Sequence, residues 1–277
     1  MVPILHAIVL GIVQGLSEFL PISSSGHLLL TPWLFDWNDF DSPSIEKAFD
    51  VALHIGTLVA AIVFFRRDLV MYVSAGLKVV FRRREPVTTE GRVGWLLLLS
   101  TVPAALAGAL FEDQIDDRLG TPGIIAVSLI LGGLLLAWAD RAAGRRPVEG
   151  YRTADALLVG AAQALALNPG TSRSGITITA ARFRGFDRDA AARISFLMMI
   201  PVTLGAIVFK LGGLASDGIP EGLLVPMIVG IVTSGLTGWL AISGTLLLVR
   251  THSFMPFVIY RVVVGTAVLI ILATGWR

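Results

Sequence analysis

The sequence contains no cysteine, few histidines and few charged residues. Without cysteine there is no disulfide, no thiol nucleophile and no thiolate metal site. The four histidines form no cluster with the spacing of a zinc site. Charged residues make up 15% of the 277 positions, whereas about 25% is usual for a soluble domain. With 55% hydrophobic residues and a mean hydropathy of +0.78, most of the surface must face lipid.

Apolar stretches of membrane-spanning length recur along the chain. A bilayer core about 30 Å thick needs about 20 mostly apolar residues per helix. One shorter stretch, 69–81, leads into Arg82-Arg83-Arg84 and is predicted to form an interfacial helix. The sequence predicts an all-α integral membrane protein with six transmembrane helices, over 51–67, 94–111, 122–140, 194–212, 222–243 and 256–275.

Two further apolar regions, 4–35 and 154–182, are each interrupted midway by polar residues, proline and glycine. Proline removes a helical hydrogen bond and clashes with the preceding turn, so neither region can form one continuous helix. Irregular backbone survives at membrane depth only where protein or a water-filled cavity surrounds it. We therefore expect both regions to be re-entrant helical hairpins.

Basic residues are distributed unevenly among the connections between these helices. Cytoplasmic loops of membrane proteins carry an excess of lysine and arginine. One set of connections holds sixteen lysines and arginines, and the other holds three together with eleven acidic residues. The chain start, the first hairpin and the C-terminus are expected outside, and the second hairpin inside. The basic set, which we place in the cytoplasm, comprises 66–93, 141–153, 182–193 and 248–255.

The two hairpin regions resemble each other in sequence. Segment 14–26 (QGLSEFLPISSSG) aligns without gaps onto segment 163–175 (QALALNPGTSRSG), at an offset of 149 residues. Two Ser/Gly-rich turns can match by chance, but the opposite entry of the two copies and the three spans after each favour an inverted-topology internal repeat. We expect a single membrane domain, 1–277, with repeat one at 1–145 and repeat two at 150–277.

Few ionisable side chains remain in the apolar regions once the loop charges are set aside. Polar groups at membrane depth are costly and are commonly functional. Arg261, in the last span, is expected to form a buried ion pair, and His54 and Asp50 are left open between an interfacial anchor and a group that supports the site. Most polar side chains lie in the hairpins, namely Glu18, Ser23, Ser24, Ser25 and His27 in the first and Ser172, Arg173 and Ser174 in the second.

These groups suit a phosphorylated substrate. Arg173 offers a planar fork of N–H donors that matches a phosphate, and helix N-termini after the prolines would present free N–H groups to an anion. Ser24 is a weak nucleophile that needs a base, and His27, three residues on along one helical face, is the nearest candidate. Glu18 could orient that imidazole or, with the oxygen of Gln14, hold a divalent cation such as Mg²⁺ or Ca²⁺.

Two motifs are specific as a pair: Gln14-xxx-Glu18 followed by PISSSGH at 21–27, and PGTSRSG at 169–175. Together they resemble the signature of the undecaprenyl-diphosphate phosphatases, the bacitracin-resistance family. Segments 193–201 and 260–265 also resemble that family, so the resemblance spans the whole chain. It implies a multi-pass enzyme of the bacterial inner membrane that removes the terminal phosphate of undecaprenyl diphosphate and recycles this lipid carrier for cell-wall synthesis.

The resemblance also implies roles for single residues. It makes Ser24 the nucleophile, His27 and Glu18 its catalytic partners and Arg173 the phosphate-binding arginine. It further implies a divalent metal and an active site that faces the extracytoplasmic side. Many members have glutamate where this chain has Gln14, so the implied metal site of Glu18 and Gln14 carries one negative charge less.

In the expected reaction, Ser172 and Ser174 hold the terminal phosphate together with Arg173. Ser23 and Ser25 either join this phosphate site or satisfy helix backbone, as serine often does in membranes. Attack on the phosphorus by the serine nucleophile and direct attack by a metal-bound water both remain open.

A secondary transporter or lipid flippase is the alternative function, because inverted repeats with broken helices are also the plan of transporters. An anion channel lined by Ser172-Arg173-Ser174 is a third interpretation. The expected partners are the polyprenyl diphosphate and membrane lipids, with a homodimer left open. The arginine runs are topology signals and contacts to anionic lipid, so no nucleic acid is expected to bind.

Overall fold

The computed structural model describes residues 2–40, 42–81, 86–217 and 222–276, and regular structure in these ranges is helical, which confirms the all-α prediction. Two short 3-10 helices, Val148–Gly150 and Leu165–Leu167, lie on either side of α8. The α-helices are α1 (Ile4–Phe19), α2 (Ser24–Phe35), α3 (Pro43–Phe64), α4 (Arg66–Phe81), α5 (Thr89–Leu99), α6 (Val102–Leu119), α7 (Pro122–Asp140), α8 (Thr153–Ala164), α9 (Arg173–Phe183), α10 (Arg188–Asp217), α11 (Leu224–Thr251) and α12 (Met255–Thr274).

Six stretches within the described ranges are long and apolar enough to cross a membrane, which confirms the predicted number. Large apolar side chains stay exposed along them, among them Leu106, Leu131 and Leu236, as expected for contact with lipid. The first stretch begins earlier than predicted because Ser42 caps α3 and a proline occupies its first turn. The stretches are Ile45–Phe64, Thr89–Leu110, Pro122–Asp140, Arg188–Phe209, Leu224–Thr251 and Met255–Thr274.

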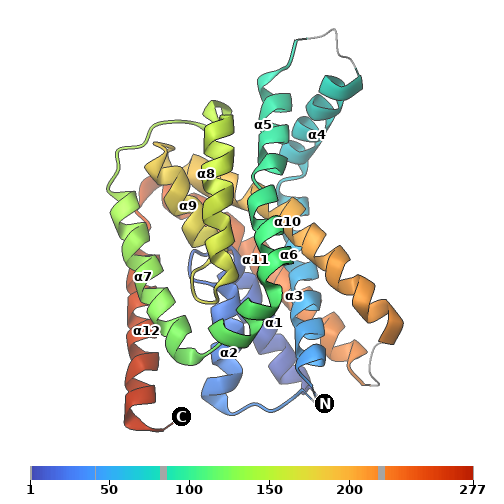
Figure 1. The fold of residues 1–277 in the computed structure, drawn as a ribbon, viewed down its shortest axis with the longest axis vertical. Coiled ribbons are helices and arrows are strands. Elements are labelled where there is room, and N and C mark those ends of the chain that lie inside the picture. Colours follow the sequence, from blue (N-terminus) through green and yellow to red (C-terminus); the bar gives the residue numbers. More distant parts are fainter. Residues whose placement is uncertain (1, 41, 82–85, 218–221, 277) are drawn as a thin grey trace.

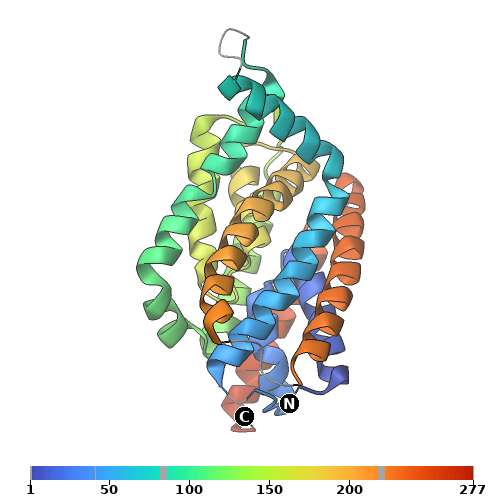
Figure 2. The same cartoon turned by 90° about the vertical axis from the view of Figure 1, so that its right-hand side faces the viewer.

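The helices form an elongated bundle whose two ends differ (Figure 1, Figure 2). Both chain termini lie at one end, together with the end of α2. At the opposite end α4 and α5 pack against each other and project beyond the other helices. The segment 69–81 is helical as part of α4, which follows α3 after the single residue Phe65.

Three long contacts build the framework: α1 against α11, α11 against α3, and α7 against α12. The first needs glycine, because a Cβ at Gly15 would lie 2.5 Å from the carbonyl oxygen of Ser234. Small residues of this kind let helix backbones approach closely in membranes. Helices α1 and α2 occupy the half of the bundle near the termini and α8 and α9 the other half, and α1 contacts α9 between them (Figure 1).

Candidate active site

The turns that precede α2 and α9 have the same conformation. Each places a serine, Ser23 or Ser172, in the left-handed backbone region (φ 83° and 72°), which residues other than glycine rarely adopt. Each serine hydroxyl accepts a hydrogen bond from a backbone N–H three residues on, that of Gly26 (3.3 Å) or Gly175 (3.0 Å), and so caps its helix. Such backbone strain costs about 1–3 kcal/mol and clusters at functional sites.

The two turns are bonded to each other. The backbone N–H of Gly170 in the second turn donates to Ser23 Oγ in the first (3.0 Å). In return, Ser174 Oγ donates to the carbonyl oxygen of Leu20 (3.1 Å). A serine from each turn therefore satisfies the backbone of the other, which fixes α2 and α9 relative to one another.

Arg261 on α12 forms hydrogen bonds with both of these turns. It is fully buried. Its N–H groups donate hydrogen bonds to main-chain carbonyl oxygens and not to the carboxylate that the sequence predicts. The two turns leave buried carbonyl oxygens without helical partners, and three of these accept hydrogen bonds from Arg261 together with two carbonyl oxygens of α7. The expected ion pair is therefore replaced by hydrogen bonds to the carbonyl oxygens of Leu129 (3.0 Å), Pro21 (3.1 Å), Ser128 (3.2 Å), Gly170 (3.1 Å) and Thr171 (2.9 Å).

Glu18, near the end of α1, is the centre of the polar cluster. Its side chain is only 4% exposed, and one carboxylate oxygen accepts a hydrogen bond from Arg173 of α9. The other oxygen accepts hydrogen bonds from Ser24 Oγ (2.5 Å) and Gln14 Nε2 (3.2 Å), and His54 Nε2 lies 3.8 Å from it. A buried charge is costly unless it is paired, so the carboxylate and the guanidinium depend on each other.

His27 is bonded to groups other than Ser24. Its Nδ1 bonds to the carbonyl oxygen of Ser23 (2.7 Å), and its Nε2 bonds to the hydroxyl of Tyr260 on α12 (2.9 Å). Ser24 is the first residue of α2, where the carboxylate of Glu18 at the end of α1 is within reach of its hydroxyl. The serine is therefore bonded to a carboxylate, and the imidazole that the sequence spacing assigned to it is held elsewhere.

The residues expected to bind phosphate differ in their surroundings. Ser25 is exposed, whereas the hydroxyls of Ser172 and Ser174 are buried and bond to each other (3.2 Å). Arg173 also donates to Thr203 Oγ1 of α10 (3.1 Å), and its side chain is 19% exposed. The Arg173 side chain is thus not closed off completely from a ligand that enters the cluster.

The cluster offers oxygen ligands for a divalent cation. Within the described ranges no three His, Asp or Glu side chains are arranged to hold a metal ion. However, Gln14 Oε1 is buried without a hydrogen-bond partner, on the side-chain amide whose nitrogen donates to the carboxylate of Glu18. An amide oxygen with no other partner can bind a cation, and Mg²⁺ is commonly held by one or two carboxylates together with substrate phosphates. Gln14 and Glu18 therefore fit a cation that a diphosphate helps to bind.

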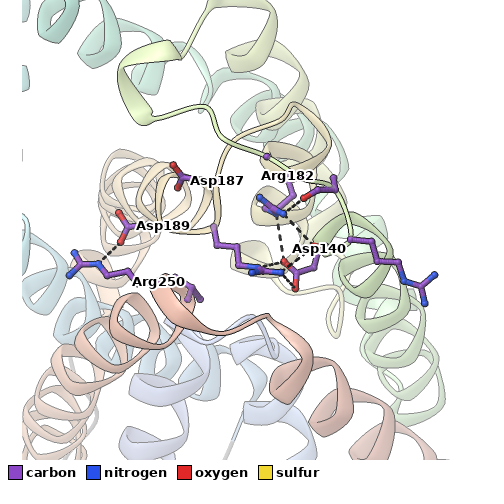
Figure 3. Close-up of a pocket in the computed structure, with 11 residues that line it drawn as sticks. Asp140, Arg182, Asp187, Asp189 and Arg250 are labelled. Atoms are coloured by element: carbon purple, nitrogen blue, oxygen red, sulfur yellow. Dashed lines mark hydrogen bonds and ion pairs between the residues drawn. The ribbon is translucent and has the colours of Figure 1, made fainter.

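A pocket of about 480 Å³ lies at the opposite end of α9 from this cluster, where α7, α9, α10 and α11 converge (Figure 3). Asp140 accepts a hydrogen bond from Arg188 (2.6 Å) and lies 3.6 Å from Arg182. Asp189 accepts one from Arg250 (2.9 Å). These ion pairs connect the ends of the helices, and none of the residues that the sequence predicts for the site lines the pocket, so it is not our candidate for the reaction.

Three neighbours of the cluster have no role assigned by the sequence motifs. The sequence does not decide between two roles for His54, and its short distance to Glu18 favours a group that supports the site over an interfacial anchor. Thr203 gave no signal, because a threonine in an apolar span is ordinary. Tyr260 begins segment 260–265, which resembles the family, but the resemblance gives this tyrosine no role.

Comparisons with known proteins agree with the sequence motifs. The sequence model of the family described as "Bacitracin resistance protein BacA" matches residues 7–267. An undecaprenyl-diphosphatase of Geobacter sulfurreducens is 48% identical over 271 residues, which cover 96% of this chain and 97% of that protein. The undecaprenyl-diphosphatases of Moorella thermoacetica and Elusimicrobium minutum are 43% and 42% identical, covering 99% and 96% of this chain and 98% and 96% of theirs.

Replacing Arg261 with lysine should destabilise the protein. A lysine ammonium cannot reach carbonyls on both turns, and each carbonyl left buried and unpaired costs about 1–3 kcal/mol. We expect Arg261→Lys to lower the free energy of unfolding in detergent by at least about 2 kcal/mol. The control is Arg193→Lys in a partly exposed pair with Asp189, which should cost less than about 1 kcal/mol. Equal losses for the two variants would contradict the role given to Arg261.

Proposed function

This chain belongs to the bacitracin resistance protein BacA family, and we infer from that membership that it is an undecaprenyl-diphosphatase. It is a multi-pass membrane protein that hydrolyses undecaprenyl diphosphate to the monophosphate and phosphate and so recycles the lipid carrier for cell-wall synthesis. The observation that carries this function is the buried contact of Glu18 with both Ser24 and Arg173. A transporter or flippase is not favoured, because the relatives matched over nearly their whole length are named for the phosphatase reaction.

We propose that α1–α2 and α8–α9 are two re-entrant hairpins related by an inverted repeat. The serine caps at Ser23 and Ser172 support this, since the same strained turn occurs twice at the offset of the sequence repeat. The hairpins also lie in opposite halves of the bundle (Figure 1). Repeat one would then be 1–145 and repeat two 150–277 of a single membrane domain.

The excess of basic residues in 141–153 and 182–193 assigns that end of the bundle to the cytoplasm. The end with the chain termini and the first hairpin would then face the outside of the bacterial inner membrane. We propose that the diphosphate enters from this extracytoplasmic side, while the prenyl tail stays in the lipid beside the helices.

In this proposal, substrate binding replaces the carboxylate of Glu18 by the terminal phosphate as the anion bonded to Arg173. The guanidinium turns from Glu18 to the terminal phosphate, which offers a bidentate match and the larger charge. The exposed hydroxyl of Ser25 and the N–H groups at the starts of α2 and α9 would complete the phosphate site. Ser172 and Ser174 would support this site from behind, because their hydroxyl protons already bond to Ser174 Oγ and to the carbonyl oxygen of Leu20. Donors fixed in a protected site in this way stabilise the charge that develops during phosphoryl transfer.

In the first chemical step, Ser24 Oγ attacks the terminal phosphorus. A bond forms between them, the bond from phosphorus to the bridging oxygen breaks, and undecaprenyl phosphate leaves. The hydroxyl proton passes to Glu18, because the hydrogen bond between Ser24 and Glu18 already prepares this transfer.

In the second step, water attacks the phosphoserine and releases phosphate. The water proton passes to Nε2 of His27, the ring nitrogen whose lone pair remains when Nδ1 donates to a carbonyl. Ser24 Oγ leaves and takes back its proton from Glu18, and His27 gives the water proton to bulk water as phosphate departs, which restores the starting state.

A divalent cation is part of the proposal. Gln14 Oε1 and Glu18, freed from Arg173, would hold it, and it would supply positive charge against the diphosphate. Gln14 carries no charge, so the cation would bind weakly without the substrate.

Purified protein in detergent should release inorganic phosphate from undecaprenyl diphosphate, with no second compartment present. Arg173→Ala should lower kcat/KM by about 10²–10³, the range for removing a donor to a developing charge. Arg173→Lys should lose less, because it keeps the charge beside Glu18. Arg250→Ala, at the distant pocket, should keep wild-type turnover, and full turnover in Arg173→Ala would refute the role of Arg173.

The covalent step can be trapped. Rapid acid quenching during turnover should leave phosphate on Ser24, detectable by mass spectrometry of the peptide that contains it. Ser24→Ala should carry no phosphate and lose at least about 10² in turnover. If Ser24→Ala turned over at the wild-type rate, direct attack by water would replace this step.

The cation site predicts a difference between two equivalent glutamines. Gln14→Leu should raise the Mg²⁺ concentration needed for half-maximal phosphate release, because the cation loses an oxygen ligand. Gln163→Leu changes the matching residue of the second repeat, which is also buried without a hydrogen-bond partner, and should leave the Mg²⁺ requirement unchanged. Equal effects, or undiminished turnover in a chelator, would contradict the site.

A further inference from the structure

The imidazole of His27 is held at both of its nitrogens. A carbonyl oxygen can only accept, so the contact of Nδ1 with the Ser23 carbonyl (2.7 Å) places the ring proton on Nδ1. In the neutral ring Nε2 then carries the lone pair, and the hydroxyl of Tyr260 donates to it (2.9 Å). The two rings also stack, with centroids 5.5 Å apart and planes 19° from parallel. The ring therefore has one tautomer and one orientation.

Tyr260 lies on α12, the helix that also carries Arg261. Its neighbour Arg261 is buried and bonds to the carbonyl of Pro21 in the turn that leads to Ser23. Tyr260 itself is 41% exposed and bonds to His27 of α2. Two consecutive residues of α12 thus bond to neighbouring parts of the first hairpin. Arg261 bonds to the turn before α2, and Tyr260 bonds to the imidazole of His27 in the first turn of α2. The exposure of Tyr260 means that its hydroxyl can move away without opening the core.

We propose that Tyr260 is a positioning residue for the phosphatase reaction. Its hydroxyl and its stacked ring hold the imidazole of His27 in one orientation, with Nε2 as the unprotonated nitrogen, until the attacking water takes the place of that hydroxyl. This inference rests on the proposed function, because it concerns the water that hydrolyses the phosphoserine. It assigns Tyr260 an effect on turnover and none on the binding of the diphosphate.

The variant that tests this is Tyr260→Phe, which keeps the ring stack and removes the hydroxyl. Phosphate release from undecaprenyl diphosphate in detergent with Mg²⁺ should show kcat lowered by about 10-fold to 100-fold, the range for removing a group that orients a functional imidazole. KM should stay within about twofold, since turnover and not binding is affected. In a His27→Gln background, Tyr260→Phe should add no further loss, because the residue acts through that imidazole.

The matched control is Tyr72→Phe on α4, which removes a tyrosine hydroxyl far from the site and should keep wild-type kcat and KM. Wild-type kcat in Tyr260→Phe, or an equal added loss in the His27→Gln background, would overturn the proposal.

A second measurement does not depend on turnover. In protein labelled with ¹⁵N-histidine, the His27 signals are those missing from His27→Gln among the four histidines. We expect a proton on Nδ1, and an Nε2 resonance that moves in Tyr260→Phe as its donor is lost. A proton on Nε2 in the wild type would overturn the proposal. If the wild type released no phosphate, the proposed function would fail, and this spectrum would decide alone on the contact between Tyr260 and His27.

Discussion

A carboxylate from one half of the chain and a guanidinium from the other meet among apolar helices, and the rest of the site depends on that contact. Neither charge would be stable there alone, because burial of an unpaired ion costs several kcal/mol. Glu18 and Arg173 therefore hold α1 and α9 together while no substrate is present. In the proposed function a diphosphate competes for the same guanidinium, so that binding of the substrate and release of the carboxylate become one event.

The ion pair is held in place by main-chain hydrogen bonds. Two turns interrupt the helices inside an apolar bundle and leave carbonyl and N–H groups without helical partners, which apolar surroundings cannot satisfy. The hydroxyls of Ser23 and Ser174 each bond to a backbone group of the other hairpin. Arg261 donates hydrogen bonds to carbonyl oxygens of both turns, among them that of Gly170. This arrangement explains how a strained backbone can persist in an apolar bundle, and it places the hydroxyl of Ser24 beside the carboxylate of Glu18.

The sequence predicts those parts of the molecule that follow from local spacing. Runs of apolar residues give the six long helices, and the four-residue spacing of Gln14 and Glu18 puts both on one face of α1. Spacing cannot give contacts that depend on how distant helices cross. Ser24 and His27 share a face of α2, yet each finds its partner on another helix, Glu18 on α1 and Tyr260 on α12. The sequence predicts a carboxylate partner for Arg261, because a buried charge in an apolar segment is expected to pair with a side chain of opposite charge. The sequence does not show which main-chain carbonyl oxygens lie within reach of the guanidinium.

The central claim is that Arg173 changes partner from Glu18 to the terminal phosphate, and a structure with a non-hydrolysable undecaprenyl diphosphate analogue tests it most directly. The account predicts the terminal phosphate between the two turns, bonded to the guanidinium of Arg173, within reach of Ser24 Oγ and with Glu18 released. The account would be contradicted by a diphosphate bound elsewhere, for example among Asp140 and Arg250, while the pair of Glu18 and Arg173 stays closed.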